Sequence, residues 1–249
     1  MTLTPTAEGQ DLAILYSGGT DSLAIYALAF AGRHPYVPRP RRIHLLHMLN
    51  GMGRFPSFPE DRLRVAQKIL SAQVPEPDRS PKTAYMELDV GRLFQGLWLD
   101  RYEELMPRYG GKNLVCVACK LAMHARAVLY CVENLVPLLL VGYTKKQGYY
   151  PEQTQVFMEK TAGFSEKLGI KTLFPVYDDF DLESVTRHLL EDFGLPSTGG
   201  GERKCLFCQT MTGATEKEIG EYLDDMVPKV TGYIGYKLEG RIRDAAMCF

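Results

Sequence analysis

Ser17-Gly18-Gly19-Thr20-Asp21-Ser22 is a short run of glycine, hydroxyl and carboxylate residues between an apolar segment and a helix-forming segment. Adjacent glycines let the chain turn tightly, so that backbone N–H groups can approach an anion. The helix that follows directs its positive end toward the same anion. Ser17 and Ser22 can add hydroxyl donors, and Asp21 is placed to hold Mg²⁺ beside phosphates. The pattern predicts a phosphate-binding loop with Asp21 as a catalytic residue.

This S-G-G-x-D-S run, with a strand before it and a helix after it, resembles the PP-loop ATP pyrophosphatase superfamily. The resemblance implies an enzyme that uses ATP and Mg²⁺ and binds ATP through residues 17–22. It also implies cleavage between the α- and β-phosphates, which releases pyrophosphate and leaves AMP on a substrate oxygen. We refer to residues 17–22 below as the phosphate loop.

Four of the six cysteines form two C-x-x-C pairs, Cys116/Cys119 and Cys205/Cys208. The first pair begins a predicted helix, whose positive end should favour the thiolate forms. Two such pairs in a chain with no secretion signal are typical of a four-cysteine metal site rather than of disulfides. Structural Zn²⁺ and an iron–sulfur cluster are the two candidates for that site.

Residues 200–208 resemble the zinc loop of 7-cyano-7-deazaguanine synthases, in which Cys205 and Cys208 match the second and third cysteines. Ser197 and Met211 stand where that family has its other two, and Cys116 and Cys119 are the expected replacements. Residues 142–175, which include a Gly-Tyr-Tyr-Pro-Glu run, are also similar to that family. The resemblance implies a ligase in which a nitrogen nucleophile displaces AMP from a carboxylate or amide oxygen. An aspartate of the family pattern is missing, which leaves the substrate open.

Cys116-Val117-Ala118-Cys119-Lys120, followed later by Val141-Gly142, also resembles the tRNA 2-thiolation enzymes. That resemblance implies a [4Fe-4S] cluster held by three cysteines and a sulfurtransferase reaction. It remains the alternative to the zinc-containing ligase.

Other polar residues give weaker signals. Lys145 and Lys146 follow a predicted strand and are candidate catalytic residues that would meet phosphates or a substrate carboxylate, although a solvated loop explains them equally well. His44 and His47 are three residues apart on a predicted strand, so they must face opposite sides, and we expect both to be core residues. Cys131 is likewise expected in the core.

Apolar runs alternate with helical patterns along the chain, which is typical of parallel β-α-β units. We expect the α/β class, with an open parallel twisted sheet covered by helices on both faces and a small C-terminal metal-binding and helical extension. The predicted division is an ATP-binding domain over 1–196 and a cysteine-bearing loop with a helical cap over 197–249. Strands are predicted at 11–16, 42–49, 84–90, 138–143 and 172–176, and helices at 22–31, 60–72, 116–134, 181–193 and from about 215.

The composition is that of a globular protein, with 45% apolar residues, 24% charged residues and a net charge of −1. Near-neutral charge favours a small-molecule or protein substrate over folded RNA, although RNA bound at a local basic patch stays open. We expect no segment to approach the roughly 20 apolar residues needed to span a bilayer, since the longest candidate, residues 135–143, is far too short. With no signal peptide, we expect a cytoplasmic protein without membrane contact. The oligomeric state stays open between monomer and homodimer.

Overall fold

The computed structural model describes residues 9–33, 39–53, 58–73, 80–179, 183–197, 205, 213–241, 244–245 and 248–249, apart from the side chains at 146, 178–179 and 183–184. The strands are β1 (Leu12–Leu15), β2 (Arg42–Leu49), β3 (Lys82–Asp89), β4 (Leu138–Val141) and β5 (Lys171–Leu173). The longer helices are α1 (Thr20–Ala31), α2 (Phe58–Gln73), α5 (Val115–Glu133), α6 (Gln155–Lys167), α8 (Glu183–Asp192) and α9 (Glu216–Leu238). Shorter helices are α3 (Gly91–Leu97), η2 (Leu99–Arg101), α4 (Tyr102–Arg108), η3 (Lys145–Gln147), η4 (Pro151–Gln153) and α7 (Pro175–Asp179).

The five strands form one sheet in the order β3-β2-β1-β4-β5. All four neighbouring pairs are parallel, and Leu12 lies between Ile43 of β2 and Leu138 of β4 in the register. The predicted parallel α/β sheet is therefore confirmed. From β1 the chain adds β2 and β3 on one side, and it then returns to add β4 and β5 on the other side of β1. The order of the strands therefore reverses at the β1/β4 boundary.

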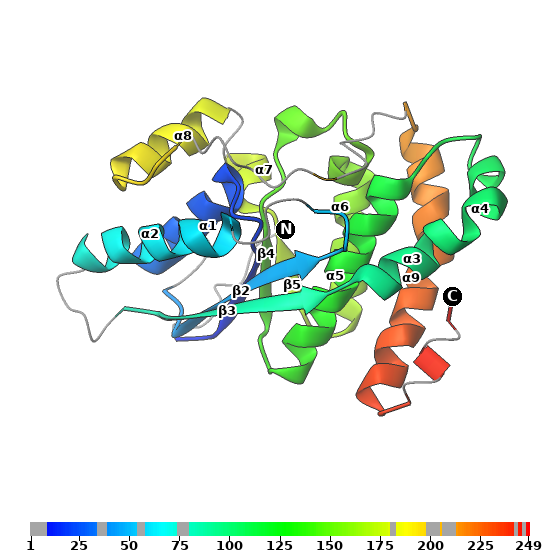
Figure 1. Ribbon diagram of the computed structural model, residues 1–249, viewed down its shortest axis with the longest axis horizontal. Helices are drawn as coiled ribbons and strands as arrows, with labels where there is room; N and C mark the ends of the chain where they lie inside the picture. The colour runs from blue at the N-terminus through cyan, green and yellow to red at the C-terminus, as the bar shows by residue number, and fades with distance from the viewer. Residues whose placement is uncertain are drawn as a thin grey trace.

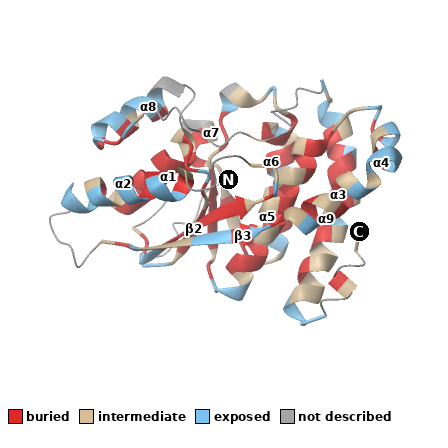
Figure 2. Ribbon diagram, in the orientation of Figure 1, coloured by how far each residue is buried: buried red, intermediate tan, exposed pale blue. Residues whose placement is uncertain are grey.

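Helices cover both faces of this sheet, as predicted (Figure 1). Successive strand residues alternate between two hydrophobic cores, since Leu12 and Ile14 join one core and Ala13 joins the other. The first core lies under α1, α2 and α8. The second lies under α3, α5, α6 and α9, and Figure 2 shows the inner faces of these helices as largely buried.

α5 is buried in the second core and packs against α3, α6 and α9. By length and composition it is apolar enough to cross a membrane, contrary to the expectation that no segment approaches the necessary length. Core helices of globular proteins pass the same test, and 67% of the apolar window is buried inside the fold.

α9 begins at the predicted place, where Thr215 forms a capping box with Glu218. Its residues Tyr222, Leu223 and Met226 are buried in the same core as α5. The division at residue 196 stays a prediction. Four α-helices of the described residues were not predicted, namely α3, α4, α6 and α7. The last of these begins at Pro175, where β5 was expected to continue to residue 176.

Candidate functional site

The phosphate loop lies at the carboxyl end of β1, between that strand and α1. The segment after β4 begins at the carboxyl end of the neighbouring strand. Ligands of open α/β sheets bind outside the carboxyl ends of strands, at the position where the strand order reverses. In this sheet that position is the β1/β4 boundary, so the topology and the sequence motif indicate the same place.

Hydrogen bonds inside the loop hold it in a tight turn. Gly18 has a φ of 77°, a conformation that favours glycine. Ser22 is buried, accepts a hydrogen bond from the backbone N–H of Ser17 at 3.3 Å and donates to the carbonyl of Gly19 at 3.2 Å. Ser17 is exposed, and its Oγ accepts from the N–H of Gly19 at 3.1 Å. Ser22 therefore shapes the loop from inside, while Ser17 is the hydroxyl nearer to solvent.

α1 begins directly after Gly19, which has no side chain to cap the first-turn N–H groups. Asp21 is half-buried in this first turn. Gly142, the first residue after β4, packs closely on the same turn, because a Cβ built there would lie 3.2 Å from the nitrogen of Ser22 and 3.3 Å from Cβ of Asp21. The helix start is thus held against β4, and its positive end faces the carboxyl edge of the sheet.

Two residues of α2 contact the phosphate loop at its buried Gly18. Sequence reasoning did not indicate these contacts. The Arg62 guanidinium donates to the carbonyl of Gly18 at 2.8 Å, and a Cβ added to Gly18 would lie 2.8 Å from Cα of Pro59. No local sequence pattern marks Arg62, because its partner is 44 positions away in the chain.

The described cysteines of the two C-x-x-C pairs are drawn together by the β2–α2 connection. Asn50 donates from Nδ2 to Sγ of Cys119 at 3.2 Å, and Gly53 forms an antiparallel bridge with Cys205. Cys116, Cys119 and Cys205 are all partly buried. Cys208 lies outside the described residues.

Burial opposes the thiolate form that the sequence favours at Cys119. Burial raises the pKa of the Cys119 thiol to about 11, and the nearby thiols of Cys205 and Cys116 raise it further. The hydrogen bond from Asn50 and the charge of Lys120 lower this pKa, but burial outweighs them.

Two observations fit a metal bound by sulfur at this position. Asn50 contacts Cys119 and Gly53 pairs with Cys205, so the two parts of the cysteine pattern lie beside one short connection although they are far apart in the chain. The amide of Asn50 points at a sulfur, which is how outer residues commonly support a metal-bound thiolate. Within the described ranges, however, no three His, Cys, Asp or Glu side chains are grouped as metal ligands, so the predicted metal-binding extension is not shown.

The segment after β4 carries Lys145, which is exposed, whereas the side chain of Lys146 is outside the described part. This segment is held by Gln153, which accepts from the backbone N–H of Thr144 at 3.0 Å. Exposure leaves Lys145 available to a ligand, and its assignment as a catalytic residue stays a prediction.

Beside the cysteines, Lys120 of α5 lies with its ammonium 5.7 Å from the ring centroid of buried Tyr143. Tyr143 in turn bonds Nε2 of the buried His124 at 2.9 Å. Glu152 is also buried, which raises the pKa of its carboxyl, although the Lys120 charge opposes that rise. Lys120 thus lies near the cysteines, beside an aromatic ring and a buried carboxyl.

The predictions that His44, His47 and Cys131 are core residues are confirmed. His44 is buried and bonds Tyr130 through Nδ1 at 2.9 Å, and His47 is buried and bonds the carbonyl of Tyr16 at 3.1 Å. Cys131 is fully buried in the core, where burial raises the pKa of its thiol to about 12.

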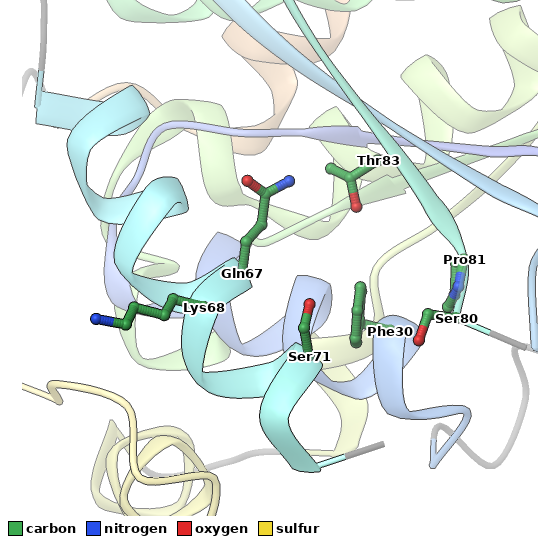
Figure 3. A pocket seen from close by; sticks show the side chains of 7 residues that line it. All are labelled: Phe30, Gln67, Lys68, Ser71, Ser80, Pro81 and Thr83. Atoms are coloured by element: carbon green, nitrogen blue, oxygen red, sulfur yellow. The ribbon is translucent and has the colours of Figure 1, made fainter. Parts of the chain in front are cut away.

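A surface hollow of about 370 Å³ lies at the ends of the strands that are opposite to the phosphate loop (Figure 3). Its walls come from the end of α1, from α2 and from the chain that enters β3. Because strands and helices alternate in direction, these elements are at the amino ends of the strands. The hollow is therefore separate from the phosphate loop, and its lining residues are Phe30, Gln67, Lys68, Ser71, Ser80, Pro81 and Thr83.

No family model matches this sequence, and no curated protein matches it. Among solved structures, the chain is similar to the U34-tRNA thiolase NcsA from Methanococcus maripaludis with its [4Fe-4S] cluster. The TM-score is 0.47 and the sequence identity 15%, over 96% of this chain and 73% of that chain.

Proposed function

We propose that this chain is an ATP-dependent adenylating enzyme that cleaves ATP into AMP and pyrophosphate. The observation that carries the proposal is the position of the phosphate loop. The loop lies at the β1/β4 boundary, where the order of the strands reverses, and the first turn of α1 beside it has no side-chain cap. The S-G-G-x-D-S residues of that loop resemble those of the PP-loop pyrophosphatases.

In this proposal, backbone N–H groups of the loop and of the α1 first turn bind the phosphates and stabilise the charge that develops on them. The Asp21 carboxylate, half-buried in the first turn, would hold Mg²⁺, which neutralises phosphate charge when it is bound. Lys145 and Lys146, on the segment after β4, would contact phosphates or a substrate carboxylate. The substrate oxygen attacks the α-phosphorus, and the bond from that phosphorus to pyrophosphate breaks.

For the rest of the reaction we favour the deazaguanine synthase-like branch, in which a nitrogen nucleophile displaces AMP from a carboxylate or amide oxygen. The 200–208 loop and the 142–175 segment support this branch through their sequence similarity. Cys116, Cys119, Cys205 and Cys208 would hold a structural Zn²⁺ ion. We propose a small-molecule or protein substrate and a cytoplasmic location.

One observation favours the second candidate, a sulfurtransferase that thiolates tRNA or a nucleobase. Cys116 and Cys205 both influence the titration of Cys119, so three cysteines lie in one region of the described chain, and the thiolation enzymes hold their cluster with three. An open iron on a [4Fe-4S] cluster would supply the sulfur-transfer chemistry.

Two measurements on the purified protein test these proposals. Chromatography of the nucleotide products should show AMP and pyrophosphate, and ADP with phosphate as main products would exclude the adenylation. Metal analysis and an absorption spectrum of anaerobically purified protein separate the branches, because zinc supports the ligase and a brown protein supports the thiolase.

A further inference from the structure

The peptide group between Gly18 and Gly19 is held at both of its ends. Its carbonyl accepts a hydrogen bond from Arg62 Nη1 at 2.8 Å, and its N–H donates to Ser17 Oγ at 3.1 Å. The C=O and N–H of a trans peptide point in opposite directions, so a bond that fixes the carbonyl also fixes the N–H. Arg62 therefore turns the N–H of Gly19 toward Ser17, which is the exposed side of the loop.

Arg62 is itself well fixed and 9% exposed. Its second terminal nitrogen donates to the carbonyl of Pro196 at 2.7 Å, and its guanidinium carbon lies 5.9 Å from the ring centroid of Phe58. A guanidinium keeps its charge at all physiological pH values and spreads its donors in a rigid fork. Two carbonyls more than a hundred positions apart are thus joined by one planar group.

The orientation of the Gly18 carbonyl and the charge of Arg62 both affect how strongly the loop can bind an anion. The Gly18 carbonyl carries a partial negative charge, and a carbonyl turned into the loop would repel a phosphate. The Arg62 bond keeps that oxygen on the buried side, where an unpaired carbonyl would otherwise be costly. It also places a positive charge behind the loop, in a partly desolvated position where charges act strongly.

We propose that Arg62 is a positioning residue for polyphosphate binding, which orients the Gly18–Gly19 peptide so that its carbonyl is held away from a bound nucleoside triphosphate and its N–H supports Ser17 on the exposed side of the loop. This inference deepens the function proposed above and rests on it. Arg62 lies on the far side of the peptide from the anion, so it acts through the backbone and makes no contact with the nucleotide.

The test compares three variants of the full chain. Arg62→Met keeps the length of the side chain and removes both donors and charge, Arg62→Lys keeps the charge but not the fork, and Phe58→Leu removes the ring beside the guanidinium while leaving both hydrogen bonds. Calorimetry measures the affinity for ATP and for inorganic tripolyphosphate, thermal unfolding reports the fold, and pyrophosphate release gives KM for ATP and kcat.

We expect Arg62→Met to weaken both ligands by tenfold or more, about what the loss of a charged hydrogen bond produces. Arg62→Lys should recover part of that loss, with KM for ATP raised about threefold at an unchanged melting temperature. Phe58→Leu removes one contact of Arg62 but neither of its donors, so it should weaken both ligands less than Arg62→Met does. A folded Arg62→Met with wild-type affinity overturns the proposal. If Arg62→Met does not fold, an Arg62→Lys variant with wild-type affinity and KM does the same. A wild-type chain that binds tripolyphosphate but neither binds nor cleaves ATP refutes the adenylating function and leaves the role of Arg62 standing, whereas one that binds neither ligand refutes both.

Discussion

Gly142 offers a way to test whether contact between β4 and the first turn of α1 is needed for activity. Replacing it with alanine adds one methyl group, which would lie 3.2 Å from the Ser22 nitrogen and 3.3 Å from both the carbonyl carbon and Cβ of Asp21. Ordinary contact begins at 3.4 Å, so the helix start must move by a few tenths of an ångström. The backbone of Gly142 is not in the left-handed region, so backbone strain should add nothing to the steric cost.

Overpacking of this kind costs about 1–3 kcal/mol, and the smaller entropy of the unfolded alanine chain offsets about 0.4–1 kcal/mol of that. We expect Gly142→Ala to lower the free energy of unfolding by about 1–2 kcal/mol and the melting temperature by roughly 2–8 °C. A displacement of about 1 Å in an active site can cost 100-fold in rate, so a few tenths should cost about three- to tenfold in pyrophosphate release.

Gly163 of α6 provides the matched control, because nothing lies within 4 Å of a Cβ built there. Gly163→Ala should raise stability by about 0.5–1 kcal/mol through helix propensity and leave the rate unchanged. Thermal unfolding and a coupled pyrophosphate assay measure both variants. If Gly142→Ala melts and turns over like the wild type, the close packing of β4 on the loop has no part in the chemistry.

Three further outcomes are expected. Asp21→Asn should nearly abolish pyrophosphate release with little change in melting temperature, because Asp21 is only half-buried and its loss removes a charged metal contact; a variant that keeps most of its rate at saturating Mg²⁺ would remove Asp21 from the site. Serine at any one of Cys116, Cys119, Cys205 or Cys208 should lower the metal content of the purified protein, whereas Cys131→Ser, at a buried core cysteine, should leave metal content unchanged in whatever protein folds; equal metal in all five variants would argue against a shared centre. Burial lowers the pKa of His124 to about 3, below its unfolded value of 6.5, so the folded state binds fewer protons and stability present above pH 6.5 should decrease as pH falls toward 3, by at most about 1.4 kcal/mol per pH unit. Urea unfolding between pH 7 and pH 5 should show a shallower decrease for His124→Gln, and parallel curves for the two proteins would refute this assignment.

The sequence alone predicted most of the scaffold because the relevant signals are local. β2 was predicted with the bounds it has, since most of its residues are apolar and loop residues flank it on both sides. The helix α9 was predicted to start near Thr215, where the capping box needs only residues 215–218. α4 was missed because it is short and contains Pro107, and α6 contains Gly163, which weakens a helical pattern.

The candidate site also has a part that local sequence predicts and a part that only tertiary contacts decide. The phosphate loop was recognisable because its internal hydrogen bonds join residues at most five positions apart. Arg62, Gly142 and Asn50 were not recognisable, since their partners Gly18, Ser22 and Cys119 are brought to them only by the packing of β4 and α2 around β1 and by the placement of α5 under the sheet. Tertiary structure also raises the pKa of the Cys119 thiol, because the folded chain buries it, which the position of Cys119 near the start of a helix could not indicate.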